Sequence, residues 1–504
     1  MSLVRSRYSV DAPQTDLLSY LFDSPYKDAG SWPPSEPLLE SAANCDRLGY
    51  SVDQIKNVVK RVGCGLNRLG ASGKRVMVYG DANINFPLAI LGVIAAGASC
   101  NVLAPGPVEE LISRLRQLDC DIVFFAPQDR ELVCTAAAKL SIPSERLFMV
   151  DETIDGENIE GSHDGGPRHW GHLLMMPGGA DYEWPRLSPA EARTRTALLL
   201  YTSGTTGSSK LAERTHYGLI GNIEQTLQHY NLRERNRETI FCNYKFCGMG
   251  FLILGFMLPL KARYKTIFPT KFEPKKFMQT IERFQPTWLM LPKHLIRAYS
   301  VTVPTRAGFY TFPDPTQVVK DATTGVLLPS LEAKIVGDNG ELLSIGQKGH
   351  VYIRTPFIMK GYFNEPEQTA QTITDDGWIK TGDIGWIDEH DQFYIVGRQK
   401  DLFKIKGDNV SAAEIETNGD EEPVPRGYIV KGNESPLTIE ELTHWICTEL
   451  TSRMQLLGGA AFIEAIPISN VGNSKVDRRR LCELAERELQ ALSNTEQEAG
   501  KPSV

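Results

Sequence analysis

The sequence predicts an α/β protein with two unequal domains, and three observations lead to that prediction. The chain has 504 residues, 41% hydrophobic and 23% charged, which is enough for a large buried core and more than one domain. Short apolar runs alternate with helical patterns through the first half, which is typical of a largely parallel sheet. Between residues 325 and 397, short alternating strands are separated by Asp-Asn-Gly and Asp-Asp-Gly turns, which predicts a small antiparallel β-module.

The expected elements of the large domain follow one another along the chain. A helical pattern covers Val52–Leu69, and the next apolar run, Lys74–Tyr79, is expected to form a strand. Phe86–Ala104 carries no charge, but it contains glycines, a proline and an asparagine and lacks basic flanks, so we expect a buried helix running into a buried strand rather than a membrane span. Further strands are expected at Asp121–Ala126, Leu147–Val150 and Ala197–Tyr201, a helix after His216, and a long polar surface loop over Asp151–Ser188.

Shifts in composition divide the chain into three parts. Residues 1–397 are expected to form a large domain of layered, mostly parallel sheets with helices and the small β-module. Residues 398–490 are expected to form a small α+β domain. Residues 491–504 are polar, and we expect them to be a disordered tail.

Charge and cysteine usage exclude several classes of function. The net charge of −8 and the pI near 5.7 argue against a nucleic-acid partner. Nine single cysteines without a Cys-x-x-Cys pair fit a reducing compartment, and the nine histidines lack zinc-ligand spacing. The first residues lack the apolar core of a signal peptide, so we expect a cytoplasmic protein. A peroxisomal location stays open, although the C-terminal Pro-Ser-Val is not an SKL-type signal.

One motif carries most of the chemical information. The apolar run Ala197–Tyr201 ends abruptly in a stretch of small, hydroxylated and glycine residues that is closed by a lysine. Glycines let backbone N–H groups approach an anion, and hydroxyl groups and an ammonium add donors, so the stretch could cradle phosphates. On the residues alone, a flexible surface loop is an equally good interpretation. The candidate phosphate-binding residues are Thr202, Ser203, Gly204, Thr205, Thr206, Gly207 and Lys210.

Four segments in the same order then resemble one known family. The stretch Leu198–Lys210 with the following Thr215-His216 resembles the phosphate loop of the adenylate-forming superfamily, which includes acyl-CoA synthetases, coumarate–CoA ligases, peptide-synthetase adenylation domains and beetle luciferases. Gly349–Phe363, Lys380–Glu416 and Asn473–Leu481 resemble three further motifs of that family. The resemblance extends over nearly the whole chain.

The resemblance implies a two-step reaction and its cofactors. A carboxylic acid, aryl or fatty, would react with ATP to give an acyl-adenylate, and a thiol of coenzyme A or of a carrier protein would then displace AMP. Mg²⁺ would accompany the triphosphate, with Thr205 as a ligand. The small domain would rotate about Lys400 between the two steps. Secondary metabolism is the expected setting.

The resemblance also assigns roles to individual residues. Asp383 would accept hydrogen bonds from the ribose, and Arg398 would brace the ribose or a phosphate, with a hinge salt bridge as the alternative role. Gly407 would leave room for the thiol arm. Asn409 stands where related ligases often have glutamine. Lys475 would stabilise the negative charge of the reacting carboxylate and α-phosphate.

The chain also departs from the family pattern. After the strand expected at Thr287–Pro292 the chain is short, and the best local match to the family's Tyr-Gly-x-Thr-Glu segment keeps Tyr299, expected to stack on adenine, and Thr302, but lacks the metal-binding glutamate. Lys245 stands where the family has a histidine; it is a candidate catalytic residue opposite the substrate carboxylate or, equally, part of a remodelled pocket wall. A second shortening follows Glu416. Further candidates for the acid pocket are Tyr244, Met249 and Phe251.

Three functions follow from these patterns. The favoured one is an ATP-dependent carboxylic acid–CoA ligase. A second is an adenylating enzyme that loads a carrier protein. The third is a non-catalytic nucleotide- or acyl-binding protein, which the missing glutamate and the Lys245 replacement favour, or a shortened gene product, which the two shortenings favour.

Overall fold

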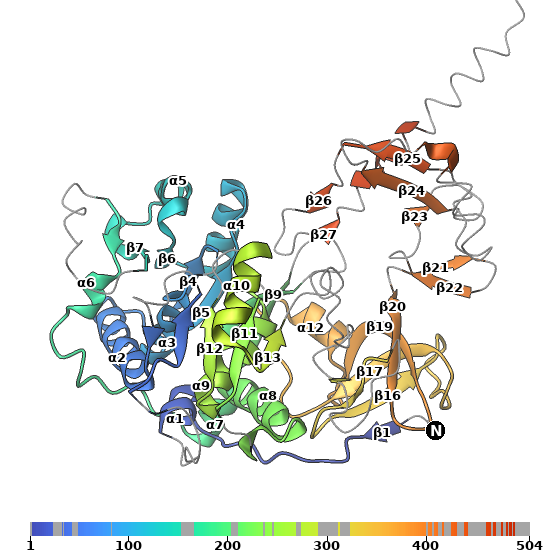
Figure 1. Ribbon diagram of the computed structural model, residues 1–504, viewed down its shortest axis with the longest axis horizontal. Helices are drawn as coiled ribbons and strands as arrows, with labels where there is room; N and C mark the ends of the chain where they lie inside the picture. The colour runs from blue at the N-terminus through green and yellow to red at the C-terminus, as the bar shows by residue number, and fades with distance from the viewer. Residues whose placement is uncertain are drawn as a thin grey trace, which may run out of the picture.

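The computed structural model of this chain describes residues 3–23, 33, 35–42, 49–81, 83–152, 166–202, 210–234, 237–243, 246–268, 274–290, 311–312 and 323–399. Beyond residue 399 it describes the stretches 402–405, 408–411, 416–417, 425–430, 438–441, 460–464, 467–469, 475–476, 480–481, 483–485 and 487–488. Three larger sheets and the helices that cover them confirm the predicted α/β class (Figure 1).

The first sheet has eight strands in the order β18-β10-β9-β5-β4-β6-β7-β8. The six strands from β9 to β8 run parallel, whereas β10 is antiparallel to both of its neighbours. Their bounds are β4 Arg75–Tyr79, β5 Ser99–Leu103, β6 Val123–Phe125, β7 Leu147–Met149, β8 Arg168–His169, β9 Thr196–Thr202, β10 Lys210–Thr215 and β18 Gly361–Tyr362.

The second sheet has the order β13-β11-β12-β2-β3 and is parallel except for the β2–β3 pair. Its strands are β2 Leu39–Ser41, β3 Gly49–Tyr50, β11 Thr239–Cys242, β12 Lys265–Phe268 and β13 Trp288–Met290. The third sheet, β1-β16-β17-β19-β20, is antiparallel throughout and confirms the predicted β-module. It consists of β1 Leu3–Arg5, β16 Glu332–Val336, β17 Gly349–Arg354, β19 Ile379–Ile387 and β20 Phe393–Arg398.

Smaller strand groups follow later in the chain. The pair β14–β15 comprises Thr311–Phe312 and Val326–Leu327. Beyond β20, the strands are β21 Leu402–Ile405, β22 Asp408–Ser411, β23 Glu416–Thr417, β24 Pro425–Val430, β25 Ala460–Ile463, β26 Ile468–Ser469 and β27 Lys475–Val476.

Helices cover both faces of the first sheet. The helices are α1 Leu17–Phe22, α2 Val52–Arg68, α3 Phe86–Ala95, α4 Val108–Leu118, α5 Arg130–Leu140, α6 Gly171–Leu174, α7 Pro189–Thr194, α8 His216–His229, α9 Leu258–Ala262, α10 Pro274–Phe284 and α12 Pro366–Thr372. Short turns are η1 Pro127–Asp129, η2 Ser144–Arg146, η4 Leu232–Glu234 and the π-helical turn η5 Phe251–Met257. The largest core lies between the first and second sheets with α2, α3 and α8, and a second core lies under α4 and α5.

The predicted helix–strand unit in the uncharged run is confirmed. Residues Phe86–Ala95 form α3, all buried, and the chain continues into β5 in the middle of the first sheet. A helix that is apolar on every side is a core helix when other elements surround it, because all of its faces need apolar contacts. No helix within the described ranges is long and apolar enough to cross a membrane.

The surface loop predicted for Asp151–Ser188 is wrong in part. Within its described residues, β8 extends the first sheet and α6 follows it. Trp170, Leu173 and Trp184 are almost completely buried. The stretch is polar on average, so its composition predicted a loop. Burial of its few large apolar side chains nevertheless gives enough free energy to order the segment. Residues 153–165 of the predicted loop lie outside the described ranges.

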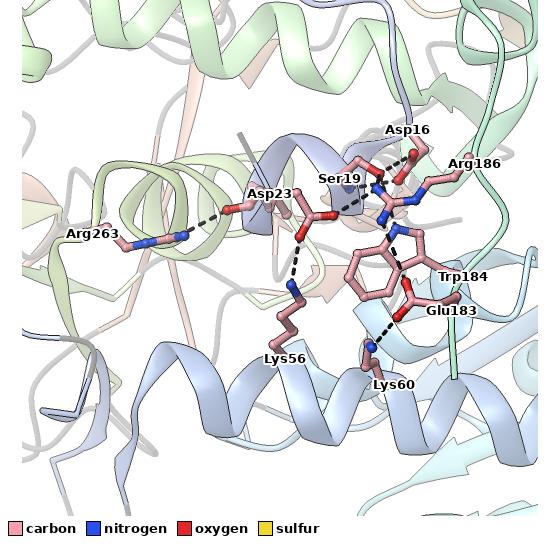
Figure 2. A network of polar contacts seen from close by, with 10 residues as sticks. Asp16, Ser19, Asp23, Lys56, Lys60, Glu183, Trp184, Arg186 and Arg263 are labelled. Atoms are coloured by element: carbon pink, nitrogen blue, oxygen red, sulfur yellow. Dashed lines mark hydrogen bonds and ion pairs between the residues drawn. The ribbon is translucent and has the colours of Figure 1, made fainter. Parts of the chain in front are cut away.

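A polar network joins that segment to the helices near the N-terminus (Figure 2). Asp23 at the end of α1 forms ion pairs with Lys56 of α2 at 2.7 Å and with Arg186 at 2.8 Å. The indole of Trp184 donates to Ser19 Oγ at 3.2 Å. Partly exposed ion pairs stabilise a fold only slightly, so the buried ring makes the larger contribution and the charged groups fix its orientation.

One close contact tests how tightly the segment after β17 packs on helix α8. A Cβ atom added to Gly221 of α8 would lie 2.0 Å from Cδ1 of Phe357, whose ring is 1% exposed. We expect Gly221→Ala to lower the free energy of unfolding by about 1–3 kcal/mol because of overpacking, although alanine favours helices over glycine by about 1 kcal/mol. Denaturant unfolding measures the effect. The Phe357→Leu change should partly restore stability in the alanine background, and a Gly221→Ala variant as stable as the wild type would contradict this packing.

Candidate functional site

The candidate phosphate loop connects two paired strands. Thr202 ends β9 and Lys210 begins β10, and the two residues are directly opposite each other in the antiparallel register. The hydroxyl of Thr202 donates to the carbonyl oxygen of Lys210 at 3.2 Å. Residues 203–209 lie outside the described ranges. Both ends of the loop are therefore fixed by one strand pair, and the sequence pattern did not predict the strand β10.

Lys210 is a buried residue at the start of a strand, not an exposed residue at the tip of a loop. Lys210 is only 9% exposed, and its ammonium group donates a hydrogen bond to Gln368 Oε1 of α12 at 2.5 Å. The same ammonium lies 5.1 Å from the ring centre of Tyr362 in β18. Neither contact partner is an anion, so the positive charge at this position is not neutralised by these two groups.

Asp383 and Arg398 are brought together by the pairing of β19 with β20. The two residues are partners in the antiparallel register, and Arg398 Nε lies 2.9 Å from Asp383 Oδ1. The guanidinium also donates to the carbonyl oxygen of Thr381 at 2.6 Å, and the Thr381 hydroxyl accepts from the Asp383 backbone N–H at 3.0 Å. Asp383 is 8% exposed, whereas Arg398 is exposed. Between Thr381 and Asp383, Gly382 of β19 has a φ of +72°, a backbone conformation that suits glycine.

Helix α12 lies between the two parts of the candidate site. It contacts β18 and β19 and carries Gln368, the partner of Lys210 (Figure 1). The loop end at Lys210 and the strand that carries Asp383 are thus attached to the same short helix.

His216, part of the phosphate-loop resemblance, anchors another helix. Its ring is 6% exposed, and Nδ1 accepts the backbone N–H of Leu17, the first residue of α1, at 3.0 Å. Burial lowers the pKa of His216 from 6.5 to about 4; nearby Asp16 opposes this change and Arg195 adds to it. Thr215 caps α8 by accepting from Gly218 N–H at 3.1 Å. These two motif residues therefore serve the fold.

The remaining predicted residues are described only in part or not at all. Asn409 lies in β22 and Lys475 in β27, where only their backbones are described. Outside the described ranges lie Ser203, Gly204, Thr205, Thr206, Gly207, Tyr244, Lys245, Tyr299, Thr302, Lys400 and Gly407. In the part of the chain that is described, no group of three or more His, Cys, Asp or Glu side chains could hold a metal ion.

The pocket prediction for Phe251 is wrong. Its ring is 2% exposed and packs against Phe246 at 5.6 Å and Phe268 at 5.2 Å between ring centres. Met249 is partly buried against the same core. An aromatic side chain in an apolar run can be a core residue or part of a pocket wall, and the sequence pattern alone does not distinguish the two.

Sequence reasoning missed Gln368, Tyr362 and Thr381. Tyr362 and Thr381 lie inside segments that resemble the family, although their contacts with Lys210 and Arg398 arise only from strand pairing. Gln368 carries no local signal, because its partner is 158 positions away in the sequence.

Comparison with known proteins places the chain in a family. The sequence profile described as AMP-binding enzyme matches residues 40–307 and 291–363, more than half of the chain. The chain belongs to the AMP-binding enzyme family. This confirms the resemblance to adenylate-forming enzymes. The two matched stretches meet at residues 291–307, next to the point where the sequence predicts a shortening.

A curated relative gives the same assignment over most of the chain. The probable 4-coumarate–CoA ligase 1 of Dictyostelium discoideum is 28% identical over 495 residues, covering 84% of this AMP-binding enzyme and 88% of the relative. Because 84% of 504 residues is fewer than 495, the relative carries residues inside the aligned region that this chain lacks.

Solved structures show the same fold. ATP-bound MatB from Rhodopseudomonas palustris has a TM-score of 0.74 and 22% identity, covering 93% of this enzyme and 98% of that chain. The anthranilate CoA ligase AuaEII, in complex with anthranoyl-AMP, has a TM-score of 0.77 and 18% identity, covering 94% and 98%.

The burial of His216 predicts a pH dependence of stability. The folded pKa of about 4 lies below the unfolded value of 6.5, so unfolding takes up a proton between these pH values. The neutral His216 ring therefore contributes about 3 kcal/mol to the free energy of unfolding. This contribution is fully present above pH 6.5 and is lost as the pH falls toward 4. His216→Asn, whose amide oxygen can accept the Leu17 N–H, should flatten this slope in denaturant unfolding. His390→Asn, at an exposed histidine, should leave it unchanged; equal slopes in all three proteins would contradict the assignment.

Proposed function

We propose that this AMP-binding enzyme joins a carboxylic acid to coenzyme A at the expense of ATP. In the first step a carboxylate oxygen of the acid bonds to the α-phosphorus of ATP and pyrophosphate leaves. In the second step the sulfur of coenzyme A bonds to the acyl carbon and AMP leaves with the electron pair of the broken bond. Both steps bring negative groups together, so catalysis depends on fixed positive charges and hydrogen-bond donors.

The Asp383–Arg398 pair is the observation that carries this proposal. A ribose presents two hydroxyl donors, and a carboxylate held in place is the acceptor that suits them. Arg398 and the Thr381 hydroxyl fix Asp383 through side-chain and backbone contacts. The ordering is complete before a nucleotide arrives, which lowers the entropic cost of binding.

The remaining parts of the proposal rest on the resemblance and the relatives. We assign residues 1–397 to the large domain and residues 398–490 to a small domain that turns about Lys400 and delivers Lys475. Tyr299 and Thr302 would contact the nucleotide, and Gly407 the thiol arm. Thr205 would contribute to the Mg²⁺ site between the phosphates. Mg²⁺ would neutralise triphosphate charge.

The names of relatives favour an aryl acid as substrate. A coumarate ligase and an anthranilate ligase are both similar to this chain over most of its length. Coenzyme A is the favoured acceptor, and a carrier-protein thiol is the alternative. We also propose a cytoplasmic location.

A non-catalytic nucleotide-binding function is the second candidate. It is favoured by the residues that the aligned relative carries and this chain lacks, because the shortening predicted after β13 would remove part of the acid pocket. In that case ATP would bind and no acyl-adenylate would form.

Acid-dependent exchange of pyrophosphate into ATP measures the first step directly. With a panel of aryl and fatty acids, we expect exchange from the wild-type protein and a loss of about 100-fold or more with Lys475→Ala, because one charge aimed at the reacting phosphate is removed. Lys501→Ala, in the C-terminal tail, is the matched control. ATP binding without exchange for any acid would establish the second candidate, and full activity of Lys475→Ala would exclude the role given to this lysine.

The ribose role of Asp383 is tested by a change that keeps the shape of the side chain. We expect Asp383→Asn to weaken equilibrium binding of ATP about tenfold, because the acceptor loses its charge and its ion pair with Arg398. Asp391→Asn, at a half-exposed aspartate between the same two strands that pairs with Arg7, should bind ATP as the wild type does. Comparing 2′-deoxy-ATP with ATP completes the test: the nucleotide that keeps only one of the two hydroxyls should lose less affinity in Asp383→Asn, and an equal loss for both would argue against a ribose contact.

A further inference from the structure

The strand register explains why Lys210 points toward α12. Ala212 of β10 is directly opposite Tyr362 of β18, and side chains alternate between the faces of a strand. Lys210, two residues before Ala212, therefore shares a face with Tyr362. The aromatic ring covers the ammonium at 5.1 Å, and Gln368 in the first turn of α12 supplies the hydrogen-bond acceptor at 2.5 Å.

The hydrogen-bond acceptor of the buried Lys210 ammonium is a neutral amide oxygen, that of Gln368. Lysine at 9% exposure has lost most of its hydration, and a carboxylate partner would compensate for that loss most directly. Nearby Lys360 has such a partner, Glu213, at 3.4 Å. In the described part of the chain, Lys210 forms no ion pair of this kind, and its ammonium contacts an amide oxygen and a ring face instead. An amide fixes the position of the ammonium and leaves its charge uncancelled.

We propose that Gln368, with Tyr362, is a positioning residue that holds the uncancelled charge of Lys210 for the β- and γ-phosphates of ATP. The inference rests on the proposed ATP-dependent function and adds two residues to which the sequence motifs assigned no role. The opposing view is that the contact only attaches α12 to the strand pair. The two views differ in what a negative charge at position 368 would do.

The deciding variant is Gln368→Glu, which keeps the side-chain length and turns the contact into an ion pair. If the contact is only structural, the ion pair preserves or raises the melting temperature and leaves ATP binding unchanged. If Gln368 keeps the lysine charge available, the carboxylate neutralises it and repels the triphosphate. We then expect the dissociation constant of ATP to rise about tenfold, with no loss of melting temperature.

Two comparisons make the experiment specific. AMP lacks the β- and γ-phosphates, so its dissociation constant should stay within about twofold of the wild-type value in Gln368→Glu. Gln371→Glu adds the same charge at an exposed position of the same helix and should leave ATP binding unchanged. Lys210→Met gives the full effect of losing the lysine charge.

The outcomes separate this inference from the proposed function. Weakened ATP binding in Lys210→Met and Gln368→Glu, with normal AMP binding in both, supports the inference. Weakened binding in Lys210→Met with normal ATP binding in Gln368→Glu overturns it and leaves the proposed function intact. Equal weakening of AMP and ATP in Gln368→Glu also overturns it. A wild-type protein that binds no ATP overturns both.

Discussion

The antiparallel pairing of β10 between β9 and β18 is the constraint on which the candidate site depends. It fixes Thr202 opposite Lys210, and so closes the loop between them, while the same strand holds Tyr362 through Ala212. The strand β18 leads into α12, which continues to β19 and Asp383. A single strand thereby sets the positions of the loop end, the helix and, through that helix, the ribose-site candidate. Because strands far apart in the sequence pair here, the candidate site forms together with the first sheet and not on a separate surface loop.

Sequence reasoning predicted the parts of the fold that have strong local patterns. The apolar run at α3 and β5, the helix α2 with its Ser51–Gln54 capping box, and the hairpins of the β-module each carry their signal within a short window. It missed β10, because KLAERT mixes charged and apolar residues without strict alternation, and only its pairing with β9 and β18 identifies it as a strand. It also missed β1, which pairs with β16 more than 300 positions away. Such contacts leave no mark in a local window.

The candidate site shows a similar division. Motif matching gave Asp383 and Arg398 separate roles at a nucleotide, and the strand register brings the two side chains together. It could not say that His216 is buried with a neutral ring against α1, or that Lys210 is covered by a tyrosine and bound by a glutamine. A motif shows which residue types stand together in the sequence. Which of them contact a ligand and which hold the fold depends on partners supplied by distant segments.

The proposed binding sites for ATP and for the acid are built on different sheets. The position of the shortened segment relative to these sheets therefore determines which site it changes. The proposed nucleotide end is built from β9, β10, β18, α12 and β19; the strands β9, β10 and β19 each pair on both sides, and α12 packs on β18 and β19. The acid side is expected beyond β13, an edge strand of the second sheet, whose three residues are each only partly buried whereas all four residues of β11 are buried. Trp288 there is covered on one side by Tyr230, at 5.1 Å between ring centres. Residues missing after β13 would therefore change the acid pocket and the segment of Tyr299 and Thr302, while the strands and the helix that carry Lys210 and Asp383 would stay paired.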